Sequence, residues 1–385
     1  MPKVSQRAQD IPPFFVMEVM RAANEREVAK DAVYHMEVGQ PGTGAPEGAL
    51  RAAEAALRQE RLGYTDALGV PKIREAIARR YRDYYGLSVA PERIVATTGS
   101  SGAFVLAFLA AFDSGDRVAL AAPGYPCYRN ILSVLDIEPV LLATELADRF
   151  QPTPALLDRA LADGPLAGLI VASPSNPTGT MLGTDEFRAL AAYCDRHGIR
   201  LISDEIYHGI TYGSDADCAL AFTQDAVVIN SFSKYFSMTG WRLGWMVMPE
   251  DLLRVTENLG QNLYISPPTL SQIAAIAALD CAEELDRNVA RYARNRELLL
   301  DALPKAGFER IAPADGAFYL YADVSDMTND SDAFCRAILA ETGVAITPGI
   351  DFDPERGNRF VRFSFAGTTE AVAAAAQALR SWRNG

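Results

Sequence analysis

The sequence predicts an α/β fold in which a large domain, with a mostly parallel β-sheet covered by helices, is joined to a smaller α+β domain. Between Ile94 and Met248, short apolar runs of strand length alternate with helical patterns, as expected for parallel strands buried on both faces. After Pro268 the pattern changes to long helices separated by a few short extended stretches. At 385 residues the chain also exceeds the usual size of a single hydrophobic core, which favours two domains.

Each predicted element of the first part rests on a local pattern. Apolar periodicity predicts a helix at 14–29, a short strand is expected at 34–38, and the glycine- and proline-rich stretch 39–44 predicts a loop. Further helices are expected at 46–58, 71–85, 103–112 and 185–197, the last of them ended by Gly198. The expected strands of the large sheet are 94–97, 118–121, 139–142, 168–172, 200–203, 227–231 and 243–248.

The second part of the chain predicts the smaller domain. A long helical stretch at 270–303 is followed by extended stretches and helices at 316–323, 331–341, 344–347, 360–365 and 369–382. Three parts are therefore expected: an N-terminal segment (1–40) that packs with the small domain, a large domain (41–282) and a small C-terminal domain (283–385).

Composition excludes several classes of function. The chain carries 36 Lys and Arg against 49 Asp and Glu, a formal net charge of −13, whereas nucleic-acid-binding proteins carry a basic surface. Its longest apolar run, 103–112, is too short to span a bilayer. The five cysteines form no Cys-x-x-Cys pair, and the three histidines form no metal-ligand pattern. Residues 1–10 are charged and polar and lack the apolar core typical of a signal peptide. We expect a cytoplasmic protein with reduced thiols, no metal, and neither a nucleic-acid nor a membrane partner.

The first candidate site segment is Gly99-Ser100-Ser101-Gly102, directly before the apolar helix at 103–112. Small residues at a helix start leave backbone N–H groups accessible, and the helix dipole adds positive potential. The segment therefore suits an anion such as a phosphate. An ordinary serine-capped turn would have the same sequence, so this segment is not diagnostic by itself.

The second segment, Ser173-Pro174-Ser175-Asn176-Pro177-Thr178-Gly179, follows the predicted strand 168–172. Its prolines restrict the loop and present Asn176, whose amide can donate to a phenolate or carboxylate oxygen. A tight turn without a binding role is the alternative interpretation.

The third segment, Asp204-Glu205-Ile206-Tyr207, follows the predicted strand 200–203. A carboxylate at a buried strand end needs a positive partner, and a protonated heterocyclic nitrogen would be one. The spacing places Asp204 and Tyr207 on one side of a helical turn. A structural salt bridge would explain Asp204 equally well.

The fourth segment covers residues 231–244 and includes Lys234 among hydroxyl and aromatic side chains. Loss of solvation at this place would lower the pKa of Lys234 and free its neutral amine for Schiff-base formation. Arg242 supplies a guanidinium suited to a phosphate dianion, and Ser231 and Ser233 can donate to the same group. Without these neighbours, Lys234 would be interpreted as a solvated surface charge.

The run 231–244 resembles the lysine-attachment signature of the class I/II pyridoxal-phosphate aminotransferases (fold type I, aspartate aminotransferase-like). Every variable position of that signature holds an allowed residue. The other motifs occur in the order typical of the family: Gly99–Gly102, Tyr125, 175–179, Asp204–Tyr207, Lys234, Arg242 and Arg362. The resemblance extends from about Val33 to the C-terminus and implies pyridoxal 5′-phosphate (PLP) as the cofactor.

The resemblance also implies a role for each motif residue around the cofactor. Lys234 would carry the cofactor as a Schiff base and move the substrate proton, and Asp204 would keep the pyridine nitrogen protonated. Tyr207 and Asn176 would bind the phenolic oxygen of the ring, and Tyr125 would stack on its face. The phosphate would be held by Ser100, Ser101, Gly102, Ser231, Ser233 and Arg242.

The substrate and subunit roles implied by the resemblance fall on other residues. Arg362 would clamp the α-carboxylate bidentately, with Asn176 and the backbone of Gly39 beside it. Tyr64 resembles the tyrosine that reaches the phosphate of the neighbouring subunit, which implies a homodimer with a shared active site.

The function that follows is that of an aminotransferase (transaminase), which moves the amino group of an L-amino acid to a 2-oxo acid in two half-reactions. A PLP-dependent lyase or decarboxylase of the same fold is the alternative, and a non-catalytic cofactor-sensing module is a third. The sequence offers no second cation for a distal carboxylate, and the apolar stretch 11–16 is expected to line the side-chain pocket. We therefore expect a neutral or aromatic donor rather than aspartate.

Overall fold

The computed structural model describes residues 2–9, 11–29 and 31–383. Its central sheet is seven-stranded, in the order β2-β8-β7-β6-β5-β3-β4. The strands are β2 (Ile94–Thr97), β3 (Arg117–Ala122), β4 (Glu138–Ala143), β5 (Gly168–Ala172), β6 (Arg200–Asp204), β7 (Val227–Ser231) and β8 (Gly244–Val247). Neighbours run parallel except at β8, which is antiparallel to both β2 and β7. The predicted α/β class with a mostly parallel sheet is confirmed.

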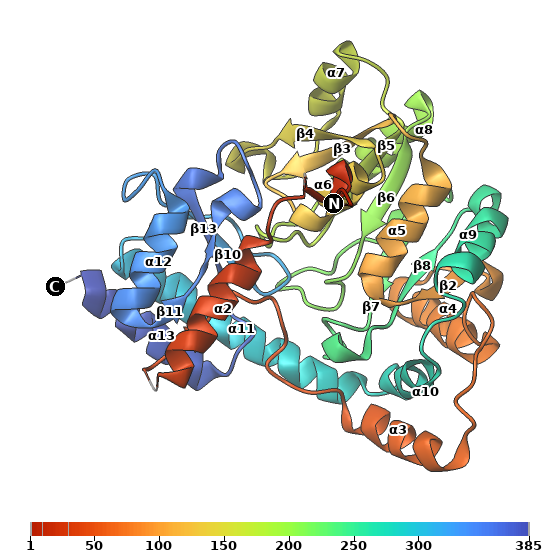
Figure 1. The fold of residues 1–385 in the computed structure, drawn as a ribbon, viewed down its shortest axis with the longest axis horizontal. Coiled ribbons are helices and arrows are strands. Elements are labelled where there is room, and N and C mark those ends of the chain that lie inside the picture. The colour runs from red at the N-terminus through yellow and green to blue at the C-terminus, as the bar shows by residue number, and fades with distance from the viewer. Residues whose placement is uncertain (1, 10, 30, 384–385) are drawn as a thin grey trace.

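Helices cover both faces of this sheet, as the apolar strands predict (Figure 1). On one face Ile170 and Ile202 pack with Phe104 of α5 (Gly99–Ala111). On the other face the alternate strand residues pack with helices that include α4 (Pro71–Tyr85) and α8 (Thr184–His197). The remaining helices of this part are α3 (Glu47–Gln59), α6 (Pro126–Val134), α7 (Pro154–Ala162), α9 (Glu250–Leu263) and α10 (Thr269–Ala278).

A second, four-stranded antiparallel sheet forms the core of the C-terminal part, in the order β12-β13-β10-β9. Its strands are β9 (Arg310–Ile311), β10 (Tyr319–Asp323), β12 (Thr347–Pro348) and β13 (Phe360–Ser364). Three helices accompany it: α11 (Ala282–Lys305), α12 (Ser331–Thr342) and α13 (Thr369–Arg383). In Figure 1, α11 runs from the neighbourhood of α10 toward this sheet.

The N-terminal segment packs against the C-terminal part. After α1 (Gln6–Gln9), helix α2 (Phe15–Val28) buries Ala23 against Leu339 and Ala345. Strand β1 (Tyr34–His35) then pairs in parallel with β11 (Val344–Ala345). The division into parts at residues 40 and 282 remains a prediction.

One predicted helix is wrong. The stretch 270–303 was expected to form a single helix, but it divides into α10 and α11 at Leu279–Cys281. The cause is a change of packing partner, because α10 buries Ala274 and Ala278 beside α3 and α4, whereas α11 packs along α13. A straight helix cannot present one continuous apolar stripe to both partners.

Three predicted extended stretches are shorter or divided, because their backbone groups bond elsewhere. The strand expected at 34–38 ends at His35, and the carbonyl of Glu37 accepts from the side chains of Arg362 and Thr347 instead. The strand expected at 316–323 begins at Tyr319. The stretch 344–347 divides into β11 and β12, which belong to different sheets.

In the part of the chain that the structure describes, the helices are all too short or too polar to cross a membrane.

The central sheet predicts where the stability of the large domain lies. Leu169, the second residue of β5, is fully buried. Leu169→Ala therefore leaves a cavity and should lower the free energy of unfolding by about 2–5 kcal/mol. The matched control is Val28→Ala, at a side chain that is 84% exposed, where a change within about 0.5 kcal/mol is expected. Urea denaturation followed by circular dichroism measures both, and equal effects would contradict the assignment of the core.

Candidate active site

A cavity of about 220 Å³ opens at the carboxyl ends of β5, β6 and β7, the edge of a parallel sheet where ligands bind. It brings together eleven of the predicted site residues: Gly39, Ser100, Ser101, Tyr125, Asn176, Asp204, Tyr207, Ser233, Lys234, Arg242 and Arg362. Gly102 and Ser231 are buried but do not line the cavity. Tyr64 is 85% exposed and does not line the cavity.

Lys234 lies in the loop after β7, with its Nζ donating to the carbonyl oxygen of Gly39 at 2.6 Å. The aromatic rings of Tyr207 and Phe318 lie within 6 Å of the same nitrogen, at 5.8 and 5.9 Å from Nζ to the ring centroids. Burial and, to a lesser extent, the positive charge of Arg362 lower the pKa of Lys234 to about 8, although Asp204 opposes the shift. The amine is therefore available in its neutral, nucleophilic form near neutral pH.

Asp204 ends β6 and is 3% exposed. One carboxylate oxygen accepts from the backbone N–H of Ile206 at 3.0 Å, and the other accepts from the hydroxyl of Tyr128. Burial raises the pKa of Asp204 to about 6, and of the groups that oppose this shift, Lys234 has the smallest effect. The site thus contains a desolvated carboxylate that a cation placed beside it would stabilise as the anion.

Tyr207 and Tyr319 connect the two sheets at the cavity. Their hydroxyl groups are 2.7 Å apart, so one donates to the other, and burial raises the pKa of both. Gly39 leaves the space for this pair, because a Cβ at that position would lie 1.7 Å from the hydroxyl of Tyr319. A side chain at residue 39 would therefore displace both the tyrosine and the carbonyl that holds Lys234.

The segment predicted to bind an anion is the first turn of α5, which begins at Gly99, not after Gly102 as expected. The first four N–H groups of a helix have no partner within it and point along the axis with the positive end of the dipole. Arg242 lies against this turn, because a Cβ at Gly99 would lie 2.6 Å from its Nη2. Ser233 faces the cavity, and its backbone N–H donates to the hydroxyl of Ser231 at 3.1 Å.

Arg362 projects from β13 into the cavity and is 3% exposed. Its Nη1 donates to Oδ1 of Asn176 at 2.8 Å, and its Nη2 donates to the carbonyl of Glu37 and to Thr347. Its Nε is buried and has no hydrogen-bond partner within the described residues. The rings of Tyr319 and Phe352 lie 4.4 and 4.8 Å from the guanidinium carbon. The free N–H suits a carboxylate ligand, because a buried donor left unpaired is costly.

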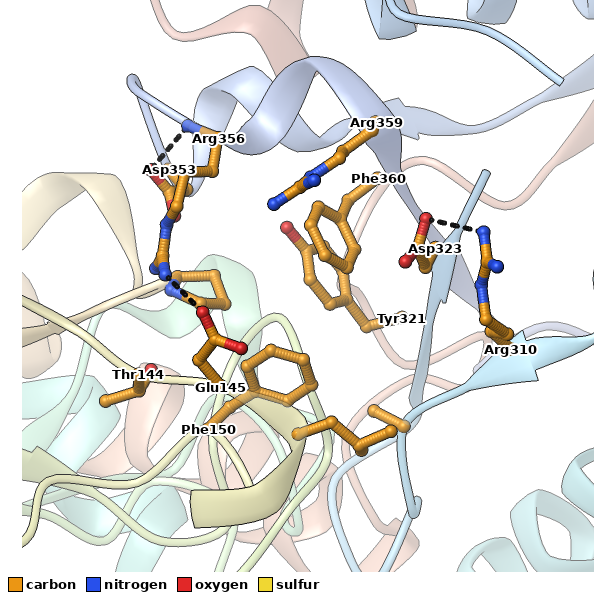
Figure 2. Close-up of a pocket in the computed structure, with 13 residues that line it drawn as sticks. Thr144, Glu145, Phe150, Arg310, Tyr321, Asp323, Asp353, Arg356, Arg359 and Phe360 are labelled. Atoms are coloured by element: carbon orange, nitrogen blue, oxygen red, sulfur yellow. Dashed lines mark hydrogen bonds and ion pairs between the residues drawn. The ribbon is translucent and has the colours of Figure 1, made fainter. Parts of the chain in front are cut away.

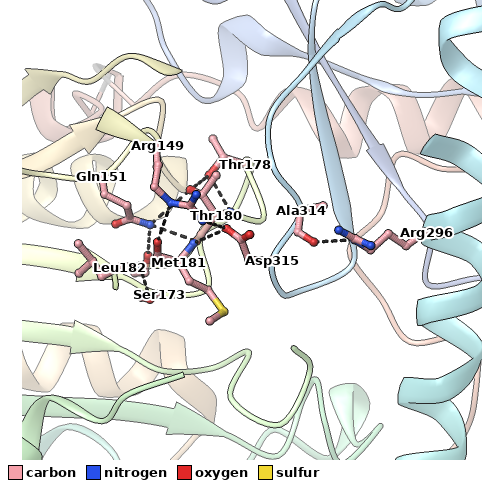
Figure 3. A network of polar contacts seen from close by, with 11 residues as sticks. Arg149, Gln151, Ser173, Thr178, Thr180, Met181, Leu182, Arg296, Ala314 and Asp315 are labelled. Carbon is pink, nitrogen blue, oxygen red and sulfur yellow. Dashed lines mark hydrogen bonds and ion pairs between the residues drawn. The ribbon is translucent and has the colours of Figure 1, made fainter. Parts of the chain in front are cut away.

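The loop that carries Asn176 is fixed by a polar network (Figure 3). The side chain of Gln151 donates to the carbonyls of Ala172 and Thr180, both at 3.1 Å. Asp315, from the stretch before β10, accepts from Met181 N–H at 3.2 Å and from Arg149. The loop is thereby attached to both sheets, and Asn176 is held at a fixed place beside Arg362.

Several cavity residues were missed from the sequence. Tyr128, the partner of Asp204, follows Tyr125 by three residues at the start of α6, so helical spacing could have indicated it. Tyr319 carries no local signal, because its role depends on the pairing of β10 with β13. Met17 lies one residue beyond the predicted apolar stretch 11–16, of which Phe14 and Val16 line the cavity.

His208 has a structural place beside the site. Its Nε2 lies 2.9 Å from the carbonyl of Ser173 and its Nδ1 lies 2.7 Å from the hydroxyl of Tyr85. Since a carbonyl only accepts, Nε2 carries the proton and Nδ1 accepts from the tyrosine. Burial lowers the pKa of His208 to about 3, so the ring stays neutral and anchors the loop. Within the described residues, no group of His, Cys, Asp and Glu side chains is arranged to hold a metal ion.

A second cavity, of about 290 Å³, lies outside this site (Figure 2). Among its charged groups, Arg356 pairs with Asp353 and Glu145, and Arg310 pairs with Asp323. It contains none of the predicted site residues.

The fold and the first cavity together define an α/β enzyme whose small pocket contains a desolvated amine, the first turn of a helix and a buried arginine with an unpaired N–H. The chain belongs to the family "Aminotransferase class I and II", whose family model matches residues 33–379. It is an aminotransferase.

Similar proteins span nearly the whole chain. A valine–pyruvate aminotransferase of Mycobacterium tuberculosis is 53% identical over 384 residues, covering 99% of this chain and 98% of that protein. A (5-formylfuran-3-yl)methyl phosphate transaminase of Methanocaldococcus jannaschii is 31% identical, covering 99% and 100%. Among solved structures, an aminotransferase from M. tuberculosis has a TM-score of 0.97 at 52% identity and covers 100% of both chains. The Thermus thermophilus aspartate aminotransferase with maleate has a TM-score of 0.91 at 30% identity and covers 99% and 100%.

The lowered pKa of Lys234 predicts its reactivity. In the cofactor-free protein, pulse acetylation at a series of pH values should modify Lys234 with a midpoint near pH 8 instead of the ordinary value of 10.5. Asp204→Asn should lower this midpoint further, because it removes the negative charge that stabilises the ammonium. Mass spectrometry of the peptides gives the midpoint, with exposed Lys305 as the internal reference for the reagent. An unshifted midpoint would contradict the burial of the amine.

Proposed function

We propose that this chain transfers the amino group of a neutral aliphatic L-amino acid, with valine as the representative donor, to pyruvate, using PLP held at Lys234. The observation that carries the proposal is that, among the described residues, the cavity has no cation left over for a second substrate carboxylate. Its lining residues include three cations, Lys234, Arg242 and Arg362, and each has a task that leaves none for a second carboxylate. The named activity of the M. tuberculosis relative supports the same donor and acceptor.

The residues of the cavity fit PLP at each of its polar groups. Asp204 is a buried carboxylate that lacks a close cation, which a protonated pyridine nitrogen would supply. Tyr207 and the amide of Asn176 are the donors for the phenolic oxygen, since Oδ1 of Asn176 is already bonded to Arg362. The phosphate would bind at the first turn of α5 with Arg242 and Ser233. Gly102 and Ser231 would support that turn from behind.

When bound, PLP supplies an aldehyde that condenses with amines and a protonated ring that withdraws electrons from the substrate Cα. The chain supplies the rest. Lys234, whose pKa is lowered to about 8, would take the proton from Cα of the substrate and deliver it to C4′ of the cofactor. Asp204 keeps the ring nitrogen charged, Tyr207 donates to the phenolic oxygen, and Tyr125 covers one face of the ring.

The substrate is held by the opposite wall of the cavity. Arg362 would bind the α-carboxylate through its unpartnered Nε and through Nη2, with the carboxylate replacing the hydrogen bond from Nη2 to Thr347. Asn176 and the Gly39 backbone lie at the sides of this contact. The substrate side chain then meets Phe14, Val16 and Met17. These apolar groups favour a branched aliphatic side chain over a charged one, because a carboxylate buried there would have no partner.

The active enzyme is proposed to be a cytoplasmic homodimer. Tyr64 is 85% exposed, which fits a side chain that reaches the phosphate of a neighbouring subunit. All five cysteines are free thiols, which fits a reducing compartment. The three-part division of the chain (1–40, 41–282 and 283–385) is proposed together with it, the site lying where the parts meet.

A donor panel tests the proposed substrate. With pyruvate as acceptor, kcat/KM for valine should exceed that for aspartate by at least about 100-fold, the cost of burying an unpaired carboxylate. Lys234→Ala is the blank, expected to lose both the visible absorbance of bound PLP and the turnover. Preferential use of aspartate would refute the proposed donor. Steady release of ammonia plus a 2-oxo acid from one amino acid alone, with no acceptor added, would indicate a lyase.

The clamp role of Arg362 predicts a defect in substrate binding. Arg362→Lys keeps the charge but loses the bidentate geometry, so KM for valine and for pyruvate should both rise by about 10- to 100-fold. The matched control is Arg359→Lys, at an exposed arginine just before β13 that lies outside the cavity. Steady-state kinetics measures the effect, and an unchanged KM would contradict the clamp.

A further inference from the structure

The apolar wall of the substrate pocket is attached to the C-terminal part of the chain by one buried carboxylate. Asp351, in the turn Gly349–Asp351, is 1% exposed. Its Oδ2 accepts from the backbone N–H of Val16 at 3.2 Å, and the N–H of Phe15 stabilises the same carboxylate more weakly. These are the first N–H groups of α2, whose own N-cap residue, Phe14, makes no side-chain capping bond. Asp351 therefore caps this helix from more than 330 residues away in the sequence.

The same turn contacts the other two walls of the cavity. Arg129 of α6 donates to the carbonyl of Asp351 at 2.7 Å, and Gly124 N–H donates to the carbonyl of Phe352 at 3.0 Å. The ring of Phe352 lies 4.8 Å from the guanidinium of Arg362. The turn thus fixes the distance from the apolar wall to the carboxylate clamp and to the loop of Tyr125.

We propose that Asp351 is a positioning residue for donor specificity, holding the first turn of α2 so that Phe14, Val16 and Met17 form the wall against the substrate side chain. The inference rests on the proposed function, since the wall matters only if the donor side chain is apolar. Asp351 does not line the cavity and acts through the helix that it caps. Its negative charge also meets the positive end of that helix.

The consequence is a selective defect. When the cap is lost, the wall should loosen and donors that reach it should bind more weakly, by about tenfold for the loss of a capping carboxylate. Alanine has a side chain too short to need the wall, so its binding should change by less than about twofold. An asparagine caps a helix about as well as an aspartate, so Asp351→Asn should retain most of the preference for valine.

The experiment compares Asp351→Ala, Asp351→Asn and Asp351→Ser with the wild-type holoenzyme. The donor half-reaction is followed in single turnovers by the loss of visible cofactor absorbance, with valine and with alanine. Deuterium uptake at 14–20 is measured in parallel. The matched control is Asp330→Ala, which removes the capping carboxylate of α12 at Ala333 N–H, 3.0 Å away, and should alter neither readout.

The expected result is a valine-to-alanine preference that falls about tenfold in Asp351→Ala with faster uptake at 14–20, and recovers in Asp351→Asn. Unchanged uptake would show that Asp351 does not hold α2. Faster uptake with an unchanged preference would show that the wall does not set specificity. If Asp351→Ala does not fold, Asp351→Ser and Asp351→Asn decide the same points. Failure of the proposed function can be told apart from failure of the capping role of Asp351. If the proposed function is wrong, wild-type protein shows no absorbance change with valine, and the deuterium-uptake measurement still tests the cap.

Discussion

The site depends on one constraint: three charged groups are held out of water in a small cavity without mutual neutralisation. Burial lowers the pKa of Lys234 to about 8 and raises that of Asp204 to about 6, and Arg362 keeps a buried N–H without a partner. Each departure from ordinary behaviour is a cost to the folded chain. In the proposed function, one group of the cofactor or substrate reduces each of these costs, so the energetic cost of the site and its affinity for these ligands would have the same physical origin.

The cavity exists because the two sheets are attached to each other at its rim. The central sheet supplies Asp204, Asn176 and Lys234 from the ends of adjacent parallel strands, while Arg362 and Tyr319 come from the antiparallel sheet. The loop network around Asp315 (Figure 3) and the turn at Asp351 hold the two contributions in register. A specific substrate-binding geometry requires such second contacts, because a displacement of about 1 Å is enough to weaken a bidentate contact.

Much of this site could be predicted from the sequence, and the part that could not has a common cause. Lys234, Asp204 and Asn176 follow apolar strands directly, so strand pattern and residue chemistry located them. Tyr319 and Asp351 have no such local signal, because what they do depends on pairing and packing with residues far away in the chain. The same cause explains the errors in the fold: the helix expected at 270–303 divides where its packing partner changes.

The sequence by itself therefore determined the class of fold, the order of the motifs along the parallel sheet and the chemistry available at each strand end, because these depend on periodicity and on residue type. Only the tertiary structure decided which groups share one cavity, where the first turn of α5 begins, and which buried atoms lack a partner. Those properties depend on distances between segments that sequence spacing does not fix. The shift of a pKa and the shape of an apolar wall follow from what lies within a few ångströms, and folding alone sets that neighbourhood.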